Sequence, residues 1–446
     1  MVIFFTVRGF KNLAPTPIRM GPLLGVAGPN GAGKSNLLDA LCLLRGLATG
    51  TVAEALRELR GTAFSKAGSD SLELEVDFLT DSLDVDELGM PARATATFLR
   101  YQLIISLAAS GFRIEREDLF SLPDARERLQ EIGSPNWVNS VLIDPGERWF
   151  IRTSPDNDAT HLELDGEGKA AFGSQTSGMK RTLLSSCSQA GHQPTAFLAR
   201  RALARIALYH FEPSALRSVD SLSERFDEEQ PIDSRGRHLP LSLLRLSERD
   251  PSVATRIANT LATVVEGIDS LRADRNDTTK SVEIRLTDLS PRELNGSLPR
   301  EFGADSLSDG TLRVLALALL LHDPRVLGTL LLEEPENGVH PNQLPALLNL
   351  LRDIACDTDL PVDETNPLRQ LCFTTHSPGL VGLLRPEEMR FAVRGDSNLG
   401  EIRFLPVGPK GVPTHLLWGF LHEEGSEITG TLAAQAEEFT RALGEP

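Results

Sequence analysis

The fold of this chain is decided by the stretch Gly28-Pro29-Asn30-Gly31-Ala32-Gly33-Lys34-Ser35, which matches the pattern G-x-x-x-x-G-K-[S/T] in full. The apolar run 23–27 before it predicts a buried strand, and leucines at helical spacing over 36–47 predict a helix. A glycine loop between a strand and a helix turns backbone N–H groups onto a phosphate. Lys34 would reach the β- and γ-phosphates, and the Ser35 hydroxyl would bind Mg²⁺. The sequence therefore predicts a nucleoside triphosphate site, contacted by Asn30, Gly31, Ala32, Gly33, Lys34, Ser35 and Asn36.

The composition limits the class of protein. The chain has 446 residues, of which 41% are hydrophobic and 24% charged, as in soluble globular proteins. No apolar run approaches the ~18 residues that cross a bilayer, and the N-terminus lacks the features of a signal peptide. Four cysteines without a C-x-x-C pair indicate neither a zinc site nor a disulfide framework. We expect a cytoplasmic protein that has no membrane partner.

The net charge of −17 argues against a surface that coats DNA, although a local basic groove is compatible with it. The best basic cluster in the sequence is Arg200, Arg201 and Arg205, which share one expected helix. We interpret this cluster as a solvated helix face. DNA therefore remains a possible partner, but the sequence indicates no particular DNA-binding site.

The rest of the chain divides by pattern into four parts. Residues 1–50 hold the glycine loop, and 51–180 read as an antiparallel β-rich part beside it. Residues 181–275 read as a helical insertion, and 276–446 return to the core. The expected strands of the second part are 72–78, 93–107, 112–120, 137–152 and 161–172, after a weak helical pattern over 50–67. The expected elements of the third part are helices at 194–206, 241–246 and 250–265 and a strand at 207–211.

Three motifs follow in the last part. Ser308, Asp309 and Gly310 open an apolar helix, where free N–H groups and the positive end of the helix dipole suit a phosphate. An ordinary N-cap is the alternative interpretation of these residues. The second motif is a buried apolar strand, 329–332, that ends in the acids Glu333 and Glu334.

The acid pair fits the hydrolysis of a magnesium nucleotide. Glu333 is placed to hold the Mg²⁺ shell, and Glu334 to orient the water that attacks the γ-phosphate. Adjacent buried carboxylates repel each other unless a cation lies between them, so a purely structural role is costly. The third motif is a strand that ends at His376, which we assign to the γ-phosphate. His340 is expected to cap the following helix.

Together these motifs resemble the heads of ABC-type ATPases. Five segments are similar in sequence to AAA-family ATPases of the OLD/RecF-like branch, where OLD means overcoming lysogenisation defect. These segments are Phe10-Lys11-Asn12, Gly28 to Asn36, Ser308 to Leu312, Glu333 to Pro341 and Thr375 to Pro378. Tyr209 to Arg217 also resembles a segment of that group. The resemblance implies an α/β fold: a P-loop ABC-type ATPase head with an antiparallel β subdomain and a helical insertion.

The resemblance implies ATP and Mg²⁺ as cofactors and a homodimer or higher homo-oligomer in which two heads sandwich ATP. Ser308 and Gly310 would then act on the nucleotide of the opposite subunit, and Asn337 would meet that subunit. Phe10 and Lys11 match a turn that touches nucleotide in related heads. Lys34, Glu334 and His376 would be the catalytic set. The glutamine that couples metal to lobe in such heads has no clear match, with Gln102, Gln175 and Gln189 as candidates.

OLD nucleases carry a C-terminal TOPRIM nuclease domain, but only 70 residues follow His376. The acidic run Asp84-Val85-Asp86-Glu87 is interpreted as a solvated turn. We therefore expect an ATPase that regulates a separately encoded effector, a nuclease or toxin, in bacterial defence against phage or foreign DNA. A DNA-repair ATPase of RecF type is the main alternative, and a nuclease is the third.

Overall fold

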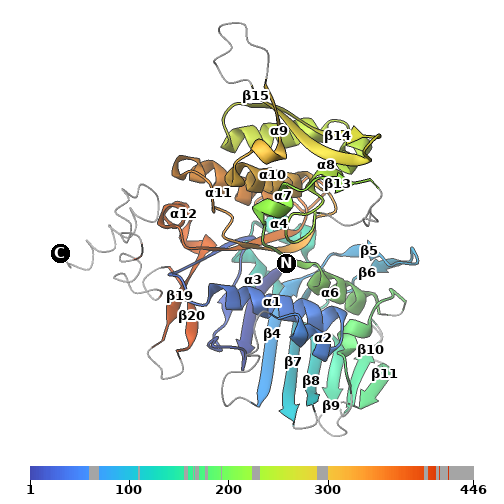
Figure 1. Ribbon diagram of the computed structural model, residues 1–446. Coiled ribbons are helices and arrows are strands. Elements are labelled where there is room, and N and C mark those ends of the chain that lie inside the picture. Colours follow the sequence, from blue (N-terminus) through green and yellow to red (C-terminus); the bar gives the residue numbers. More distant parts are fainter. Residues whose placement is uncertain are drawn as a thin grey trace, which may run out of the picture.

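The computed structural model describes residues 1–59, 70–108, 111–154, 159–163, 165, 170–175, 179–191, 193–222, 232–288, 300–395, 400–407, 411 and 420. Residues 60–67 of the weak helical pattern therefore lie outside the described residues. Within these residues the strands form an eight-stranded sheet, a six-stranded sheet, a four-stranded sheet and a two-stranded hairpin. Figure 1 shows the four-stranded sheet and its helices above, and the eight-stranded sheet below.

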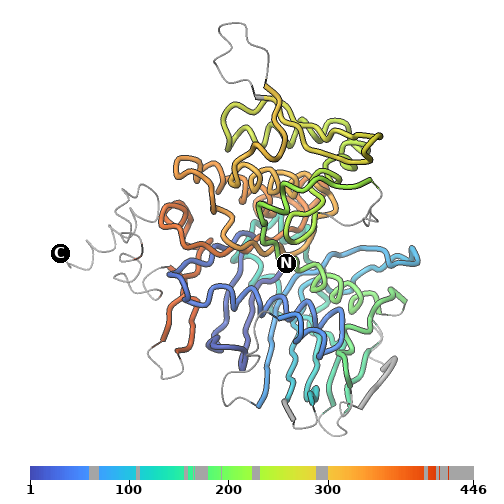
Figure 2. Tube along the Cα trace, in the orientation of Figure 1, coloured from blue at the N-terminus to red at the C-terminus, as the bar shows by residue number. Residues whose placement is uncertain are grey.

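The six-stranded sheet carries the glycine loop. Its strands, in spatial order, are β12 (Ile206–Tyr209), β17 (Gly328–Glu333), β18 (Arg369–Thr375), β3 (Leu23–Ala27), β19 (Met389–Arg394) and β20 (Ile402–Pro406). All neighbours are parallel except β19 and β20. In Figure 2, blue N-terminal segments therefore lie beside red C-terminal segments. Because parallel strands end at one edge, the segments after β3, β12, β17 and β18 meet there.

Helices cover both faces of the parallel sheet. Along β17, Leu330 and Leu332 belong to one hydrophobic cluster and Leu331 to another, which is the alternation of a strand buried on two sides. One face packs against α10 (Asp309–His322) and α11 (Leu344–Ile354), and the other against α1 (Lys34–Thr49) and α6 (Pro194–Ala204). The expected helix after the glycine loop and the buried helix that begins at residue 309 are confirmed.

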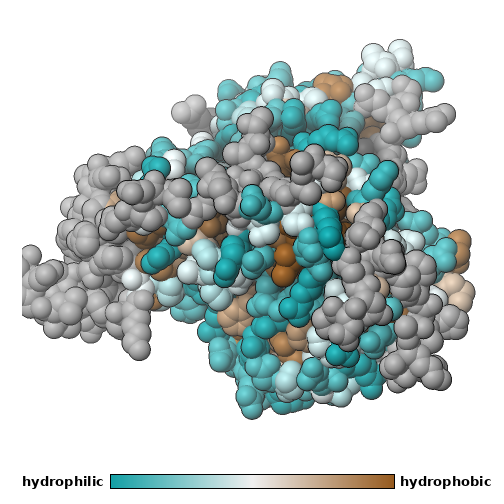
Figure 3. Space-filling model, turned by 90° about the horizontal axis from the view of Figure 1, so that it is seen from below, coloured by the Kyte–Doolittle hydropathy of each residue, from teal (hydrophilic) through white to brown (hydrophobic). Residues whose placement is uncertain are grey.

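The eight-stranded sheet is antiparallel. Its strands, in order, are β11 (Ala170–Gln175), β10 (Ala159–Glu163), β9 (Trp149–Ser154), β8 (Gly111–Ser121), β7 (Phe98–Ala108), β4 (Ser71–Leu79), β1 (Val2–Arg8) and β2 (Ile18–Arg19). Beside it lie the hairpin β5 (Leu83–Val85) and β6 (Pro91–Arg93) and the helices α2 (Val52–Arg57), α3 (Ala125–Gln130), α4 (Pro135–Val141) and α5 (Leu183–Ser186). The surface visible from below is mostly hydrophilic, with scattered hydrophobic residues (Figure 3).

The expected strand at 137–152 is wrong over residues 137–148, and only its end, from Trp149, lies in a strand. Residues 135–141 form α4, because the Ser134 side chain accepts a hydrogen bond from the Trp137 N–H at 3.2 Å and Pro135 occupies the first helical position. The Trp137 ring is fully buried, and its Nε1 lies 3.4 Å from Cys356 Sγ. An N-cap and a long-range contact thus outweigh the strand preference of the side chains.

The helical lobe consists of α8 (Leu239–Arg249) and α9 (Val253–Val264) against the four-stranded sheet. The strands of this sheet are β13 (Asp220–Ser221), β15 (Ser281–Asp288), β14 (Ile268–Asn276) and β16 (Arg300–Gly303). The remaining elements are α7 (Pro213–Leu216), α12 (Pro378–Leu383) and the 3₁₀ helices η2 (Ala304–Ser306), η3 (Pro341–Gln343) and η4 (Pro386–Glu388). The expected α/β class, with an antiparallel β subdomain and a helical insertion, is confirmed. None of the helices in the described part of the chain is long and apolar enough to span a membrane.

Candidate nucleotide site

The glycine loop has a backbone that side chains would obstruct. Gly28, Gly31 and Gly33 have φ angles of 146°, 74° and 82°, which L-residues with side chains rarely adopt. A Cβ on Gly33 would also lie 1.9 Å from Ile402 Cδ1, whereas nothing lies within 4 Å of a Cβ on Gly31. The loop is therefore tightly packed at its helix end and open at its tip, as a phosphate cradle requires.

Lys34 lies inside this loop. Its Nζ donates hydrogen bonds to the carbonyl oxygens of Gly28 at 2.7 Å and Pro29 at 3.1 Å, and the residue is buried. Burial lowers the pKa of Lys34, while the negative charges of Glu334 and Glu336 act to raise it. The ammonium group thus shares one electrostatic environment with the acids after β17. Ser35, Asn30 and Gly31 are exposed beside it.

The Phe10-Lys11-Asn12 turn is fastened to α1. The Lys11 ammonium forms an ion pair with Asp39, and Asn36 Nδ2 donates to Asn12 Oδ1 at 2.7 Å. The Phe10 side chain is fully buried in the hydrophobic cluster around α1. This burial gives Phe10 a packing role and leaves its ring no exposed face for a nucleotide, whereas Lys11 lies next to the loop.

Glu334 stands in an unusual backbone conformation directly after β17. Its φ is 47°, and its N–H donates to the carbonyl oxygen of Thr374 at 3.1 Å. Its Oε2 accepts a hydrogen bond from Asn337 Nδ2 at 2.8 Å. His376 Nδ1 lies 3.0 Å from Glu334 Oε1, in close contact but outside hydrogen-bond geometry. Such left-handed residues cost about 1–3 kcal/mol and concentrate at functional sites, so the structure holds this carboxylate in a set direction.

Glu336 is a third acid in the site that sequence reasoning did not single out. The side chain is almost fully buried, and its Oε1 accepts a hydrogen bond from Thr375 Oγ1 at 2.5 Å. Among the described residues, its buried Oε2 has no hydrogen-bond partner. Burial raises the pKa of Glu336, and the bond from Thr375 counteracts this. The third acid of Glu-Glu-Pro-Glu was the signal that could have found it.

Glu333 contacts His210, which sequence reasoning also missed. His210 Nδ1 lies 2.8 Å from Glu333 Oε2, and the Glu333 side chain is only 9% exposed. Tyr209 pairs with Leu332 in the parallel ladder, so the next residue of each strand emerges at the same edge. The expected strand at 207–211 contained His210, but the sequence did not indicate that this strand lies beside the strand that ends at Glu333.

The motif at the start of α10 is joined to the loop after β17. Ser308 caps α10 by accepting the Thr311 N–H at 3.1 Å, and Ser308 and Asp309 are exposed. Gly310 is buried, and a Cβ on it would lie 2.1 Å from the carbonyl oxygen of Gly338. None of the hydrogen bonds or ion pairs among the described residues joins these three residues to the glycine loop.

Other expected sites have structural roles. Asp84 forms ion pairs with Arg201 at 2.9 Å and Arg205 at 2.8 Å, so neither the acidic turn nor the basic cluster is the solvated surface that we expected. Asp86 is buried and accepts backbone N–H groups, including that of Ala190 at 3.0 Å. His340 caps η3, as expected.

The three candidate glutamines lie away from Glu333. Gln102 donates to Glu75 within the antiparallel sheet at 2.6 Å, and Gln189 is exposed after α5. Gln175 ends β11 at the edge of that sheet, and its side chain lies outside the described residues. None of the three follows β12, the strand beside β17; the residue directly after β12 is His210.

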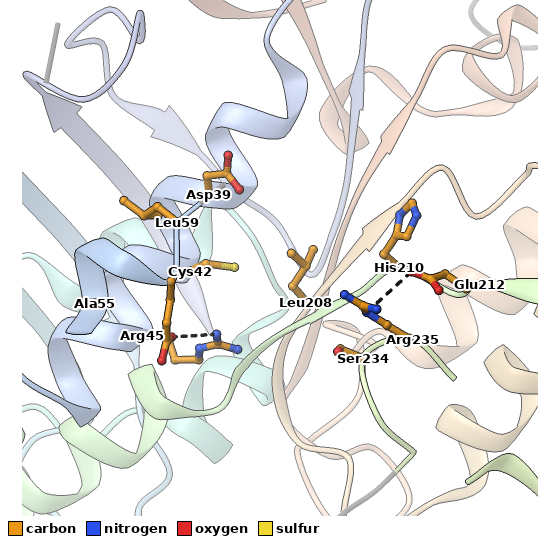
Figure 4. A pocket seen from close by; sticks show the side chains of 11 residues that line it. Asp39, Cys42, Arg45, Ala55, Leu59, Leu208, His210, Glu212, Ser234 and Arg235 are labelled. Carbon is orange, nitrogen blue, oxygen red and sulfur yellow. Dashed lines mark ion pairs between the residues drawn. The ribbon is translucent and has the colours of Figure 1, made fainter. Parts of the chain in front are cut away.

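A cavity of about 410 Å³ adjoins His210. It lies between α1, which contributes Asp39 and Arg45, and the segment after β12, as Figure 4 shows. Glu212 and Arg235 line the wall opposite α1, with 3.6 Å between Arg235 Nε and Glu212 Oε1. The wall that carries His210 therefore faces open space instead of a packed core.

The residues present fit Mg²⁺ and a triphosphate. Mg²⁺ prefers oxygen ligands and is commonly held by one or two protein groups together with substrate phosphates. Ser35 and Glu333 supply such oxygens, and the described residues contain no closed cluster of His, Cys, Asp and Glu that could hold a metal alone. The buried Lys34 also interacts electrostatically with Glu336, whose Oε2 has no hydrogen-bond partner among the described residues.

Comparison with known proteins gives the family. The family described as "AAA domain, putative AbiEii toxin, Type IV TA system" matches residues 23–382. The chain is also similar to the chromosome partition protein Smc of Mycobacterium tuberculosis, with 27% identity over 164 residues. That alignment covers 35% of this chain and only 13% of the Smc protein.

Solved structures of SMC heads are more distant. The SMC head bound to the C-winged helix domain of ScpA is 13% identical, with a TM-score of 0.47 and coverage of 91% of this chain and 98% of that one. The SMC head of Thermotoga maritima is 11% identical, with a TM-score of 0.38 and coverage of 92% and 99%. Likeness at this level carries no inference about activity or partners.

The matched family range contains the glycine loop, the acid pair and His376, and it covers most of the chain. Proteins of this family are ATPases of the AAA type. The chain belongs to this AAA-domain family.

Proposed function

We propose that the chain is an ABC-type ATPase of the OLD/RecF-like branch in which ATP acts as a switch. The observation that carries the proposal is Glu334, whose backbone is held at a positive φ while Asn337 and His376 contact its two oxygens. A carboxylate oriented in this way, beside the buried ammonium of Lys34, suits the activation of water next to a phosphate.

The roles of the residues follow from their positions. Lys34 would leave the Gly28 and Pro29 carbonyls to bind phosphate oxygens, and the backbone of residues 30–36 would surround them. Ser35 and Glu333 would hold the Mg²⁺ shell, where the ion neutralises phosphate charge. Glu334 would accept the proton of the attacking water, and His376 would orient that water or the γ-phosphate.

We infer that assembly completes the site. Ser308 and Asp309 are exposed at the N-terminus of α10 and have no bond to the glycine loop of their own chain. A second copy could present these residues to the γ-phosphate, giving an ATP-linked homodimer or higher oligomer. Asn337 would lie at the same interface, because its carbonyl oxygen already binds Arg313 of α10 at 2.6 Å.

We further propose that residues 1–50 and 276–446 supply most of the ATPase core, 51–180 most of the β-rich part and 181–275 most of the lobe, and that the protein works in the cytoplasm. The exceptions are β1 and β2, which join the eight-stranded sheet, β12, which joins the six-stranded sheet, and β15 and β16, which join the sheet of the lobe. The effector would be a separately encoded nuclease or toxin in a defence system. The description of the matched family, which names a putative AbiEii toxin and a type IV toxin–antitoxin system, supports a link to a toxin system and does not itself name a separate effector.

A DNA-repair ATPase of RecF type is the second candidate. Its support is the sequence similarity to part of a chromosome partition protein. For the nuclease alternative, two of its candidate acids have structural partners, because Asp84 is paired with two arginines and Asp86 accepts hydrogen bonds from backbone N–H groups.

The test measures ATP hydrolysis and association of the purified full chain. We expect ATP turnover without DNA cleavage, loss of ATP binding in Lys34→Ala, and co-purification with a protein encoded beside it. Turnover that plain duplex DNA stimulates without any effector would favour the RecF-type function. Absence of ATP binding by the parent protein would refute both.

A further inference from the structure

His210 stands where the parallel sheet meets the helical lobe. Its imidazole Nδ1 is 2.8 Å from Glu333 Oε2, and its side chain is 55% exposed while that of Glu333 is 9% exposed. The contact follows from the ladder between β12 and β17, which brings the two residues out at one edge. The imidazole therefore lies on the outer side of the carboxylate that we assign to Mg²⁺.

The backbone on either side of His210 is bound to the start of the lobe. The His210 N–H donates to the carbonyl oxygen of Ser234 at 2.7 Å, and the Glu212 N–H donates to that of Arg235 at 2.9 Å. Ser234 and Arg235 belong to a tight turn in which Asp233 Oδ1 accepts the Arg235 N–H at 2.9 Å.

This turn, residues 232–238, leads directly into α8. Asp233 Oδ1 also accepts the Arg237 N–H at 2.7 Å, so the turn is closed as a unit. Two backbone hydrogen bonds and one short turn thus separate the imidazole from the first helix of the lobe. A shift of His210 would move this turn.

The structure leaves room for such a shift. The cavity of about 410 Å³ separates His210, Glu212 and Arg235 from Asp39 and Arg45 of α1 (Figure 4). Packed interiors resist displacement because they contain few voids. A segment that borders a cavity can change its distance from α1 without disturbing a packed core.

We propose that His210 is a positioning residue that couples Glu333 to turn 232–238 and α8, so that loading of Mg²⁺–ATP changes the state of the lobe. The inference rests on the function proposed above. An imidazole that contacts Glu333 has to adjust when a cation attracts that carboxylate. Its main chain carries the adjustment to Ser234.

The experiment uses the full chain carrying Glu334→Gln, so that bound ATP persists. Hydrogen exchange is measured by mass spectrometry for peptides covering 232–249, with and without Mg²⁺–ATP, while a fluorescent ATP analogue reports affinity in parallel. We expect Mg²⁺–ATP to slow exchange in this segment by roughly 5- to 150-fold, the usual span of coupling between two sites.

His210→Ala should abolish this protection while the analogue still binds. His210→Gln should keep most of the protection, because an amide N–H can donate to Glu333. His161→Ala, on β10 of the antiparallel sheet, is the matched control and should behave as the parent. Melting temperatures verify that each variant is folded.

Full protection in folded His210→Ala would overturn the coupling. Loss of analogue binding in His210→Ala would also overturn it, because His210 would then hold the nucleotide site together instead of transmitting its state. If the parent protein itself binds no analogue, the proposed ATPase function fails, and that failure is recognisable without any His210 variant.

Discussion

The close approach of Gly310 to Gly338 leads to a quantitative prediction. A Cβ on Gly310 would lie 2.1 Å from the Gly338 carbonyl oxygen and 2.7 Å from its carbonyl carbon. Ordinary contact begins at 3.4 Å, so the two backbone segments must separate by about 1.3 Å (3.4 − 2.1). Neither atom belongs to a flexible side chain, so either the loop after β17, which contains Gly338, or α10 has to move.

The cost of Gly310→Ala comes from overpacking, which typically destabilises by about 1–3 kcal/mol. The displacement would also strain the 2.6 Å bond from Arg313 to the Asn337 carbonyl oxygen. Because Asn337 also donates to Glu334, hydrolysis should fall together with stability. Urea unfolding gives the change in free energy, and an ATPase assay at a temperature where the variant is folded gives the second effect.

Gly21→Ala is the matched control. Its Cβ would meet only the Leu23 carbonyl oxygen, at 3.6 Å, which is ordinary contact. We expect the free energy of unfolding of this variant to stay within about 0.5 kcal/mol of the parent, as for most surface changes. If Gly310→Ala is as stable as Gly21→Ala, the packing argument is refuted. A loss of hydrolysis without a loss of stability would assign Gly310 to phosphate contact alone.

Three further predictions address the site and the sheet. Glu334→Gln should lower ATP turnover by about 10²–10⁴-fold and trap an ATP-bound oligomer, which light scattering after gel filtration would detect; turnover at the parent rate would show that Glu334 is not the base. Thr375→Val should slow hydrolysis, because it removes the donor to Glu336 Oε1 in a buried site; a normal rate would limit Glu336 to a structural role. Burial raises the pKa of Glu117 from 4.5 to about 7, so the stabilisation from the protonated carboxyl is complete below pH 4.5 and disappears as the pH rises through about 7. Urea unfolding across this range should show a decline that is flatter in Glu117→Gln, and equal slopes would contradict the shift.

Local features of the fold were predictable because they depend on residues that are consecutive in the chain. The strand before the glycine loop, the helix after it and the helix that Ser308 caps follow from periodicity and capping. The error at 137–152 has a physical source. Trp137 favours a strand by composition, but Ser134 and Pro135 start a helix that buries its ring beside Cys356.

Candidate site residues within the motifs could be named from sequence, but their contacts could not. The acid pattern pointed to Glu333 and Glu334, yet it did not predict the positive φ of Glu334. The polarity of Asp84 suggested solvent exposure, whereas the fold pairs it with Arg201 and Arg205, which are more than a hundred residues later. Such pairings are tertiary, and composition carries no information about them.

The sequence by itself determined that this chain contains a strand–glycine loop–helix unit and an acid-ended strand, because both depend on neighbouring residues and the φ freedom of glycine. Only the tertiary structure decided that His210 contacts Glu333 and that Gly310 lies under Gly338. Parallel strand order joins segments that are distant in the chain, and the local pattern of each strand is compatible with several neighbours. The order of β12, β17, β18 and β3 therefore determines which side chains meet at the loop.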